Sequence, residues 1–250
     1  MIGVVIGDIA GSTFEFNNTD DYNFPLFARG SDYTDDTICS VAVADAILSG
    51  KSYQESLHAW CNKYPDPKGA YGGSFSRWIM SSKPKPYNSF GNGAAMRVGP
   101  VGWAFEAESI VAAEAQKSAE CTHNHPEGIK GAVAVAKAIF MLRTTKDKNS
   151  LSDIIAMYDG YKRPKRGVFD VTCQGCVPLA LDIIMQSRNF EDAIRLAVSY
   201  GGDTDTVGAI VGAMAEAIYD VPSNLREMAF AMLPDEMKVV VSEFEAKYNA

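Results

Sequence analysis

The chain has 250 residues, of which 47% are apolar and 22% are charged, and its formal net charge is −8. This is the composition of a globular protein, and a single core can serve this length because cores stop growing near ~250–300 residues. The acidic balance and the absence of a basic stripe argue against nucleic acid or an anionic membrane as a partner.

The N-terminal segment, residues 1–11, is apolar but short, lacks a basic start and contains Asp8, so it does not resemble a signal peptide. The longest apolar stretch, residues 131–142, is interrupted by Lys137 and is too short to span a bilayer. The five cysteines are scattered and odd in number, which favours a reducing compartment over a disulfide framework. We therefore expect a cytoplasmic protein without a membrane association.

Helical periodicity recurs along most of the chain. Apolar residues spaced at i, i+3, i+4 and i+7 predict helices over residues 38–48, 52–63, 106–120, 132–140, 177–186, 190–199, 207–218 and 235–248. Residues 2–6 could form a strand or a buried helix, and periodicity cannot separate the two over so short a run. Segments rich in Pro, Gly, Asn, Tyr or Asp predict irregular structure over residues 17–33, 64–73, 82–93 and 159–170. We predict an all-α fold with one domain over residues 1–250.

Glu15 is the first candidate for chemistry along the chain, because it lies between Phe14 and Phe16. An apolar setting disfavours the charged carboxylate and raises its pKa, which would make Glu15 a usable general acid or base. Judged from spacing alone, a Glu on a solvated helix face is the more common situation.

Two acidic clusters, residues 34–37 and 202–206, stand directly before helix-patterned segments. One Asp at a helix start is an ordinary cap, but the adjacent Asp35 and Asp36 repel each other unless a cation lies between them. In the second cluster, Asp203 and Asp205 would repel each other in the same way. If the fold brings the clusters together, their oxygen ligands suit Mg²⁺ or Mn²⁺ better than zinc or copper. Two such ions ~3.5–4 Å apart can orient sugar hydroxyls and activate a water.

Glycine and alanine in residues 89–97 allow the backbone to approach a ligand closely, and consecutive amides there can bind an anion. The segment has neither the Walker nor the dinucleotide-binding glycine pattern, so a tight turn before a helix stays an alternative. Residues 71–75 are also glycine-rich, and they too could approach a ligand or form a tight turn before a helix. With no cysteine nearby, His123 and His125 favour a surface or helix-capping role over a metal site, and a contact to a ligand hydroxyl is the functional alternative. The segment Cys173-Gln174-Gly175-Cys176 favours a helix start over a redox or zinc site.

Six segments in chain order together resemble the ADP-ribosylglycohydrolase family, which includes the dinitrogenase-reductase-activating glycohydrolases. They are GDIAGSTFEF from Gly7, YTDDT from Tyr33, YGGSF from Tyr71, FGNGAAMR from Phe90, THNHP from Thr122 and GGDTDT from Gly201. The resemblance implies an all-α bundle with two Mg²⁺ or Mn²⁺ ions at one face. The metal ligands that it implies are Thr34, Asp35, Asp36, Asp203, Asp205 and Thr206.

The same resemblance implies the remaining site residues. The catalytic set is Glu15, which would assist proton transfer, with Asp35, Asp203 and Asp205. The diphosphate of ADP-ribose would be bound by Asn92, Gly93, Ala94, Ala95 and Met96, with Ala94 standing where many relatives have glycine. His123 would lie near the ribose, and Gly72 and Gly73 would line the same pocket. The bond to C1″ of the distal ribose would break through an oxocarbenium-like transition state.

The resemblance implies a hydrolase that removes ADP-ribose from a protein side chain, with arginine favoured by analogy with bacterial relatives. Serine-linked, polymeric or O-acyl ADP-ribose are alternatives, so the partner is an ADP-ribosylated protein or a small molecule that contains ADP-ribose. A non-catalytic ADP-ribose-binding or structural protein is a further alternative. A dinucleotide-binding oxidoreductase is disfavoured because the glycine fingerprint is missing. We expect the loops at 17–33 and 159–170 to set the linkage preference.

Overall fold

Helices make up nearly all of the regular structure in this chain. A computed structural model describes residues 1–248, and the all-α prediction is confirmed because these residues form helices and isolated bridges but no β-strand. None of the helices in this part combines the length and the hydropathy that a bilayer crossing demands. The elements are α1 (Ile2–Gly11), α2 (Asp35–Ser49), α3 (Tyr53–Lys63), α4 (Gly73–Ile79), α5 (Gly93–Met96), α6 (Gly99–Ala104), α7 (Glu108–Glu120), α8 (Pro126–Thr145), η1 (Lys148–Leu151), α9 (Ser152–Ala156), α10 (Cys173–Gln186), α11 (Phe190–Tyr200), α12 (Thr204–Ile218), α13 (Ser223–Met232) and α14 (Asp235–Tyr248).

All eight helices predicted from periodicity are present, as α2, α3, α7, α8, α10, α11, α12 and α14. The structure adds α1, α4, α5, α6, α9 and α13, most of which are too short to show a periodic pattern. The open question over residues 2–6 is resolved in favour of a helix, because they begin α1. The helix α10 starts at Cys173, so the Cys173–Cys176 segment does enter a helix, and both cysteines are buried and free.

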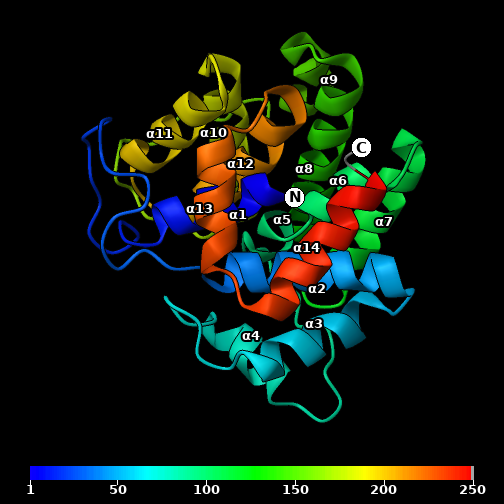
Figure 1. Cartoon of the computed structure of the whole chain (residues 1–250). Coiled ribbons are helices and arrows are strands. Elements are labelled where there is room, and N and C mark those ends of the chain that lie inside the picture. The colour runs from blue at the N-terminus through cyan, green and yellow to red at the C-terminus, as the bar shows by residue number, and fades with distance from the viewer. Residues whose placement is uncertain (249–250) are drawn as a thin grey trace.

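The helix α1 runs through the centre of the molecule beside α12 (Figure 1). All ten of its residues are buried, as expected for a helix that is apolar on every side. Three glycines at every fourth position, Gly3, Gly7 and Gly11, lie on one face and meet α12 backbone to backbone. This close approach brings the start of α12 next to the C-terminal half of α1, where Asp8 lies.

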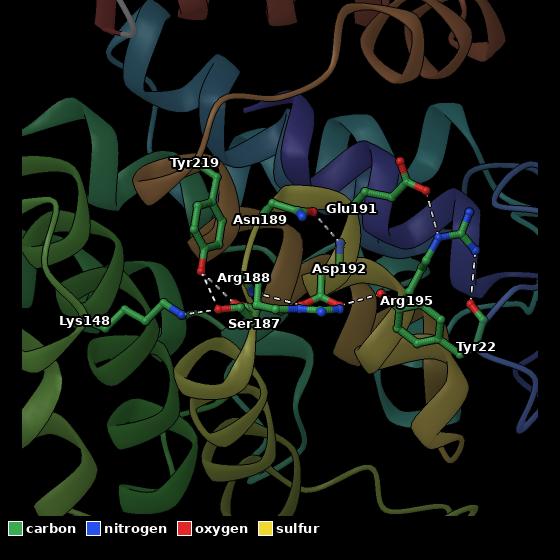
Figure 2. Close-up of polar contacts among 9 residues, drawn as sticks. All are labelled: Tyr22, Lys148, Ser187, Arg188, Asn189, Glu191, Asp192, Arg195 and Tyr219. Atoms are coloured by element: carbon green, nitrogen blue, oxygen red, sulfur yellow. Dashed lines mark hydrogen bonds and ion pairs between the residues drawn. The ribbon is translucent and has the colours of Figure 1, made fainter.

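The irregular segment 17–33 lies against α11 (Figure 1) and is tied to it by a polar network. Figure 2 shows the Tyr22 hydroxyl donating to Asp192 and Arg195 Nη1 donating to the carbonyl of Tyr22, at 3.1 Å. Arg195 Nη1 also donates to the carbonyl of Phe24, at 2.8 Å. The first half of this segment is therefore anchored to a helix rather than free.

Candidate active site

The two acidic clusters lie side by side at the starts of α2 and α12. Asp36 and Thr206 are 170 positions apart in the chain, yet Thr206 Oγ1 donates to Asp36 Oδ2 across 3.3 Å. One carboxylate oxygen from each of Asp8, Asp36 and Asp205 lies within 4.8 Å of the others. The expected convergence of the clusters is confirmed.

Local sequence explains why each cluster stands at a helix start. Thr34 is the N-cap of α2, and its hydroxyl accepts a hydrogen bond from the Asp36 amide at 3.2 Å. Before α12, Gly201 and Gly202 have φ angles of +77° and +89°, which glycine adopts without strain. The free amides and the dipole of each helix start favour carboxylates at these positions.

Asp8 is the residue that links α1 to the first cluster, and the sequence analysis did not include it among the site residues. Its carboxylate accepts four hydrogen bonds, from the amides and hydroxyls of Thr34 and Thr37, at 2.5–3.0 Å. Burial and the nearby Asp205 carboxylate raise the pKa of Asp8 to about 7, although these hydrogen bonds oppose the shift. The sequence did contain a signal for Asp8, since it is the one charged residue in an otherwise apolar segment. Burying a charge costs free energy unless the group is paired, hydrogen-bonded or bound to a metal.

Asp36 shows that the cluster fits a cation. Its Oδ1 atom is buried and has no hydrogen-bond partner, which is rare for a carboxylate oxygen. Burial, followed by repulsion from Asp205 and Asp8, raises the pKa of Asp36 well above its usual range. An oxygen-only set of repelling carboxylates with an unpartnered buried oxygen matches the donor preference of Mg²⁺ and Mn²⁺. The cluster could therefore hold such an ion.

A second group of carboxylates joins Glu15, Asp203 and Asp205, one oxygen from each lying within 4.8 Å of the others. Glu15 is in the turn that follows α1, not on a solvated helix face, and it is partly exposed. Burial and then the Asp205 carboxylate raise the pKa of Glu15 to about 8, the direction that the sequence predicted. Asp35 belongs to neither group of three, although burial also raises its pKa.

A cavity of about 450 Å³ opens over these groups. Among the predicted site residues, those that line it are Glu15, Asp35, Gly72, Gly73, Asn92, Gly93, Met96, His123, Asp203, Asp205 and Thr206. Thr34 and Asp36 are buried and are not part of the lining, and the same is true of Ala94 and Ala95. Residue 169 comes from the expected loop at 159–170, whereas no residue of 17–33 lines the cavity. The first half of the 17–33 loop is tied to α11, and an effect of this loop on linkage preference stays a prediction.

The glycine-rich loop is joined to the carboxylates by Asn92. Its Nδ2 donates to Asp203 Oδ2 at 2.6 Å, and its backbone amide donates to the carbonyl of Val171 at 2.8 Å. Gly93 stands beside the His123 ring, where a Cβ atom would lie 3.2 Å from ring atoms. The loop is thus fixed between α10 and the histidine, with its small residues at the points of closest approach.

His123 is buried at the cavity wall, and the two histidines of its motif have different roles. Burial and then the cation of Arg97 lower the pKa of His123 well below its usual range, so the ring is neutral at pH 7. Its Nδ1 is 2.7 Å from Thr122 Oγ1, which also accepts from Arg97 Nη2 at 2.7 Å. His125 instead caps α8, its Nδ1 accepting from the amide of Glu127.

Comparison with known proteins identifies related sequences and a related fold. The sequence profile of the ADP-ribosylglycohydrolase family matches residues 1–244. The ADP-ribosylarginine hydrolase Tri1 of Pseudomonas putida is 26% identical, over 88% of this chain and 70% of that protein. The ADP-ribosyl-[dinitrogen reductase] glycohydrolase of Rhodospirillum rubrum is 25% identical, over 90% and 86% of the two chains.

Human ADP-ribosylhydrolase ARH3 is 22% identical, over 88% of this chain and 84% of that protein. A solved structure described as an ADP-ribosylglycohydrolase-related protein complex superposes with a TM-score of 0.78 at 22% identity, covering 98% and 95% of the two chains. That likeness establishes a shared fold. With the family profile matching almost the whole sequence, the chain belongs to the ADP-ribosylglycohydrolase family and is a hydrolase of glycosidic bonds.

Proposed function

We propose that this protein is a metal-dependent hydrolase that cleaves the C1″ glycosidic bond of ADP-ribose attached to arginine side chains of proteins. The observation that carries the proposal is the meeting of the two acidic clusters, with the 3.3 Å contact between Thr206 and Asp36, beneath a cavity that the glycine-rich loop also lines. The choice of arginine is supported by one similar protein that is named an ADP-ribosylarginine hydrolase.

Two divalent cations, Mg²⁺ or Mn²⁺, would be held by the six oxygen-bearing residues of the two clusters, while Asp8 fixes the start of α2 through its hydrogen bonds to Thr34 and Thr37. When bound, such ions would polarise the ribose hydroxyls and activate a water molecule. The six residues are Thr34, Asp35, Asp36, Asp203, Asp205 and Thr206. Chemistry supports this set of metal ligands, because every donor is an oxygen atom and Asp36 Oδ1 has no hydrogen-bond partner in the protein.

The protein side chains have separate tasks in this proposal. Burial and the Asp205 carboxylate raise the pKa of Glu15, which favours the protonated carboxyl group that can donate a proton to the departing nitrogen. Asp203 and Asp205 position the attacking water, and the Asn92 contact fixes the direction of the Asp203 carboxylate. The backbone at Asn92, Gly93 and Met96, which line the cavity, takes the diphosphate. His123, Gly72 and Gly73 close the cavity around the ribose.

The test uses two peptides of the same sequence, one with arginine-linked and one with serine-linked ADP-ribose. Each is incubated with the protein in Mg²⁺, in Mn²⁺ and in a chelator, and release of ADP-ribose is measured. We expect release from the arginine-linked peptide that the chelator abolishes and that Asp36→Asn and Asp205→Asn lower by at least about 100-fold. Release that persists in chelator would refute metal dependence, and a preference for the serine-linked peptide would refute the linkage.

A further inference from the structure

Two phenylalanines at the mouth of the cavity are exposed in a way that the fold does not explain. Phe16 is 76% exposed and Phe169 is 48% exposed, although the residues come from segments far apart in the chain. Their rings stack on each other with centroids 6.0 Å apart and an angle of 26° between planes. Both line the cavity that holds the carboxylates. Exposed apolar surface beside a binding cavity indicates a contact with a ligand or partner.

The two segments are held in place by a shared anchor, the Gly201–Gly202 turn. The side chain of Asn18 donates to the carbonyls of Phe14 and Gly202, at 2.6 and 3.1 Å, and accepts from the Gly202 amide at 2.8 Å. On the other side, a Cβ on Gly202 would lie 2.6 Å from the carbonyl oxygen of Val168, so the backbones are in direct contact. The segments that carry the two phenylalanines therefore both contact the same turn, which places the two rings side by side.

Phe16 and Phe169 lie next to the residues that the proposed function places at the glycosidic bond. The inference about this aromatic pair rests on that proposed function. Phe16 directly follows Glu15, and the Phe169 backbone lies against Gly202, the residue before Asp203. The acceptor side chain leaves from this bond, so it must pass the residues that flank Glu15. The adenine ring, by contrast, lies at the far end of ADP-ribose, beyond the diphosphate and the second ribose.

The chemistry of the arginine acceptor matches this surface. A glycosylated guanidinium group is planar and cationic, and such groups stack on the faces of aromatic rings. A serine acceptor offers neither a plane nor a charge. We propose that Phe16 and Phe169 form an acceptor subsite that recognises the guanidinium group of arginine-linked ADP-ribose.

The test compares Phe16→Leu, Phe169→Leu and the double variant with the wild type on the arginine- and serine-linked peptides. Leucine keeps apolar surface but removes the aromatic face, so we expect the double variant to lose about 10-fold in kcat/KM on the arginine-linked peptide. Any residual turnover of the serine-linked peptide should change by less than about twofold, since the oxygen acceptor makes no cation–π contact. Phe16→Trp keeps an aromatic face and should retain activity near the wild-type level. Met80→Ala, which removes an equally exposed apolar side chain outside the cavity lining, is the matched control.

A binding measurement separates this inference from turnover. In a Glu15→Gln background, calorimetry of the intact arginine-linked peptide should show weaker binding when both phenylalanines are replaced. Free ADP-ribose should bind all these variants with unchanged affinity. Equal losses for ADP-ribose, or equal losses for both linkages, would overturn the acceptor subsite while leaving the proposed function intact. A wild-type protein that hydrolyses neither peptide would refute the proposed function, and the subsite with it.

Discussion

A Cβ atom placed on Gly7 would lie only 1.9 Å from the carbonyl oxygen of Gly208. The reciprocal distance, from a Cβ on Gly208 to the carbonyl oxygen of Gly7, is 2.4 Å, so neither position has room for a side chain. One residue beyond Gly7 lies Asp8, and three residues before Gly208 lies Asp205. The contact between these two glycines therefore sets the separation of the carboxylates that repel each other across the helix pair.

We expect Gly7→Ala to destabilise the protein by about 3 kcal/mol, because the added methyl group must push the two central helices apart. Urea unfolding at pH 7 measures this change. Gly72→Ala is the matched control, since Gly72 has a φ of −55° and no atom within 4 Å of an added Cβ. Equal unfolding midpoints for the two variants would contradict the close packing of α1 against α12.

We expect Asp8→Asn to weaken Mn²⁺ binding by about 10- to 100-fold, the range seen when groups that orient metal ligands are removed. The asparagine amide cannot accept all four hydrogen bonds that now fix Thr34 and Thr37 at the start of α2. Isothermal titration of Mn²⁺ into the chelator-treated protein checks the prediction. Asp153→Asn, at an exposed position, serves as the control, and an unchanged affinity in Asp8→Asn would exclude Asp8 from the metal site.

The long helices and the two acidic clusters could be predicted from the sequence because both are local patterns. Asp35 and Asp36 repel each other whatever the fold, and the apolar spacing of α8 specifies a helix without its neighbours. The role of Asp8 could not be predicted in this way. It depends on glycines of α1 meeting those of α12, which is a contact between segments about 200 residues apart.

The residues that surround the mouth of the cavity could not be predicted from the sequence either. The segments 17–33 and 159–170 both have the composition of irregular loops, but Asp192 and Arg195 tie the first of them to α11. Phe16 and Phe169 carry no local signal of their shared position, because the Gly201–Gly202 turn that joins their segments lies far along the chain. Tertiary anchoring, not local composition, decides which loop reaches the site.

The raised pKa values predict how metal-free stability depends on pH. Asp8 has a pKa of about 7 and Glu15 one of about 8 in the folded protein, against ordinary values near about 4 in the unfolded chain. Between these limits the folded state binds more protons than the unfolded state, so its stability falls as pH rises from about 5 to 8. Because cations compete with protons for these carboxylates, Mn²⁺ should raise the melting temperature more at pH 8 than at pH 5.5. Thermal unfolding with Mn²⁺ and with chelator, at pH 5.5 and at pH 8, measures the increase in melting temperature. An increase at pH 8 that is equal to or smaller than the increase at pH 5.5 would contradict the prediction.

The Asp192 network in Figure 2 predicts the opposite pH dependence. Hydrogen bonds from Arg188 hold the pKa of Asp192 below its usual range, with the Tyr22 hydroxyl adding to this effect, while burial opposes it. A lowered pKa gives stability that is present above the unfolded value of about 3.9 and is lost as pH falls further. We expect Asp192→Asn to cost about 2 kcal/mol at pH 7, typical of hydrogen bonds to a buried charged group, and progressively less below about pH 4. Glu191→Gln, which breaks a more exposed ion pair to Arg195 on the same helix, should cost under about 0.5 kcal/mol in urea unfolding. A loss in Asp192→Asn that stays constant from pH 7 to pH 3 would show that the carboxylate charge does not anchor the 17–33 loop to α11.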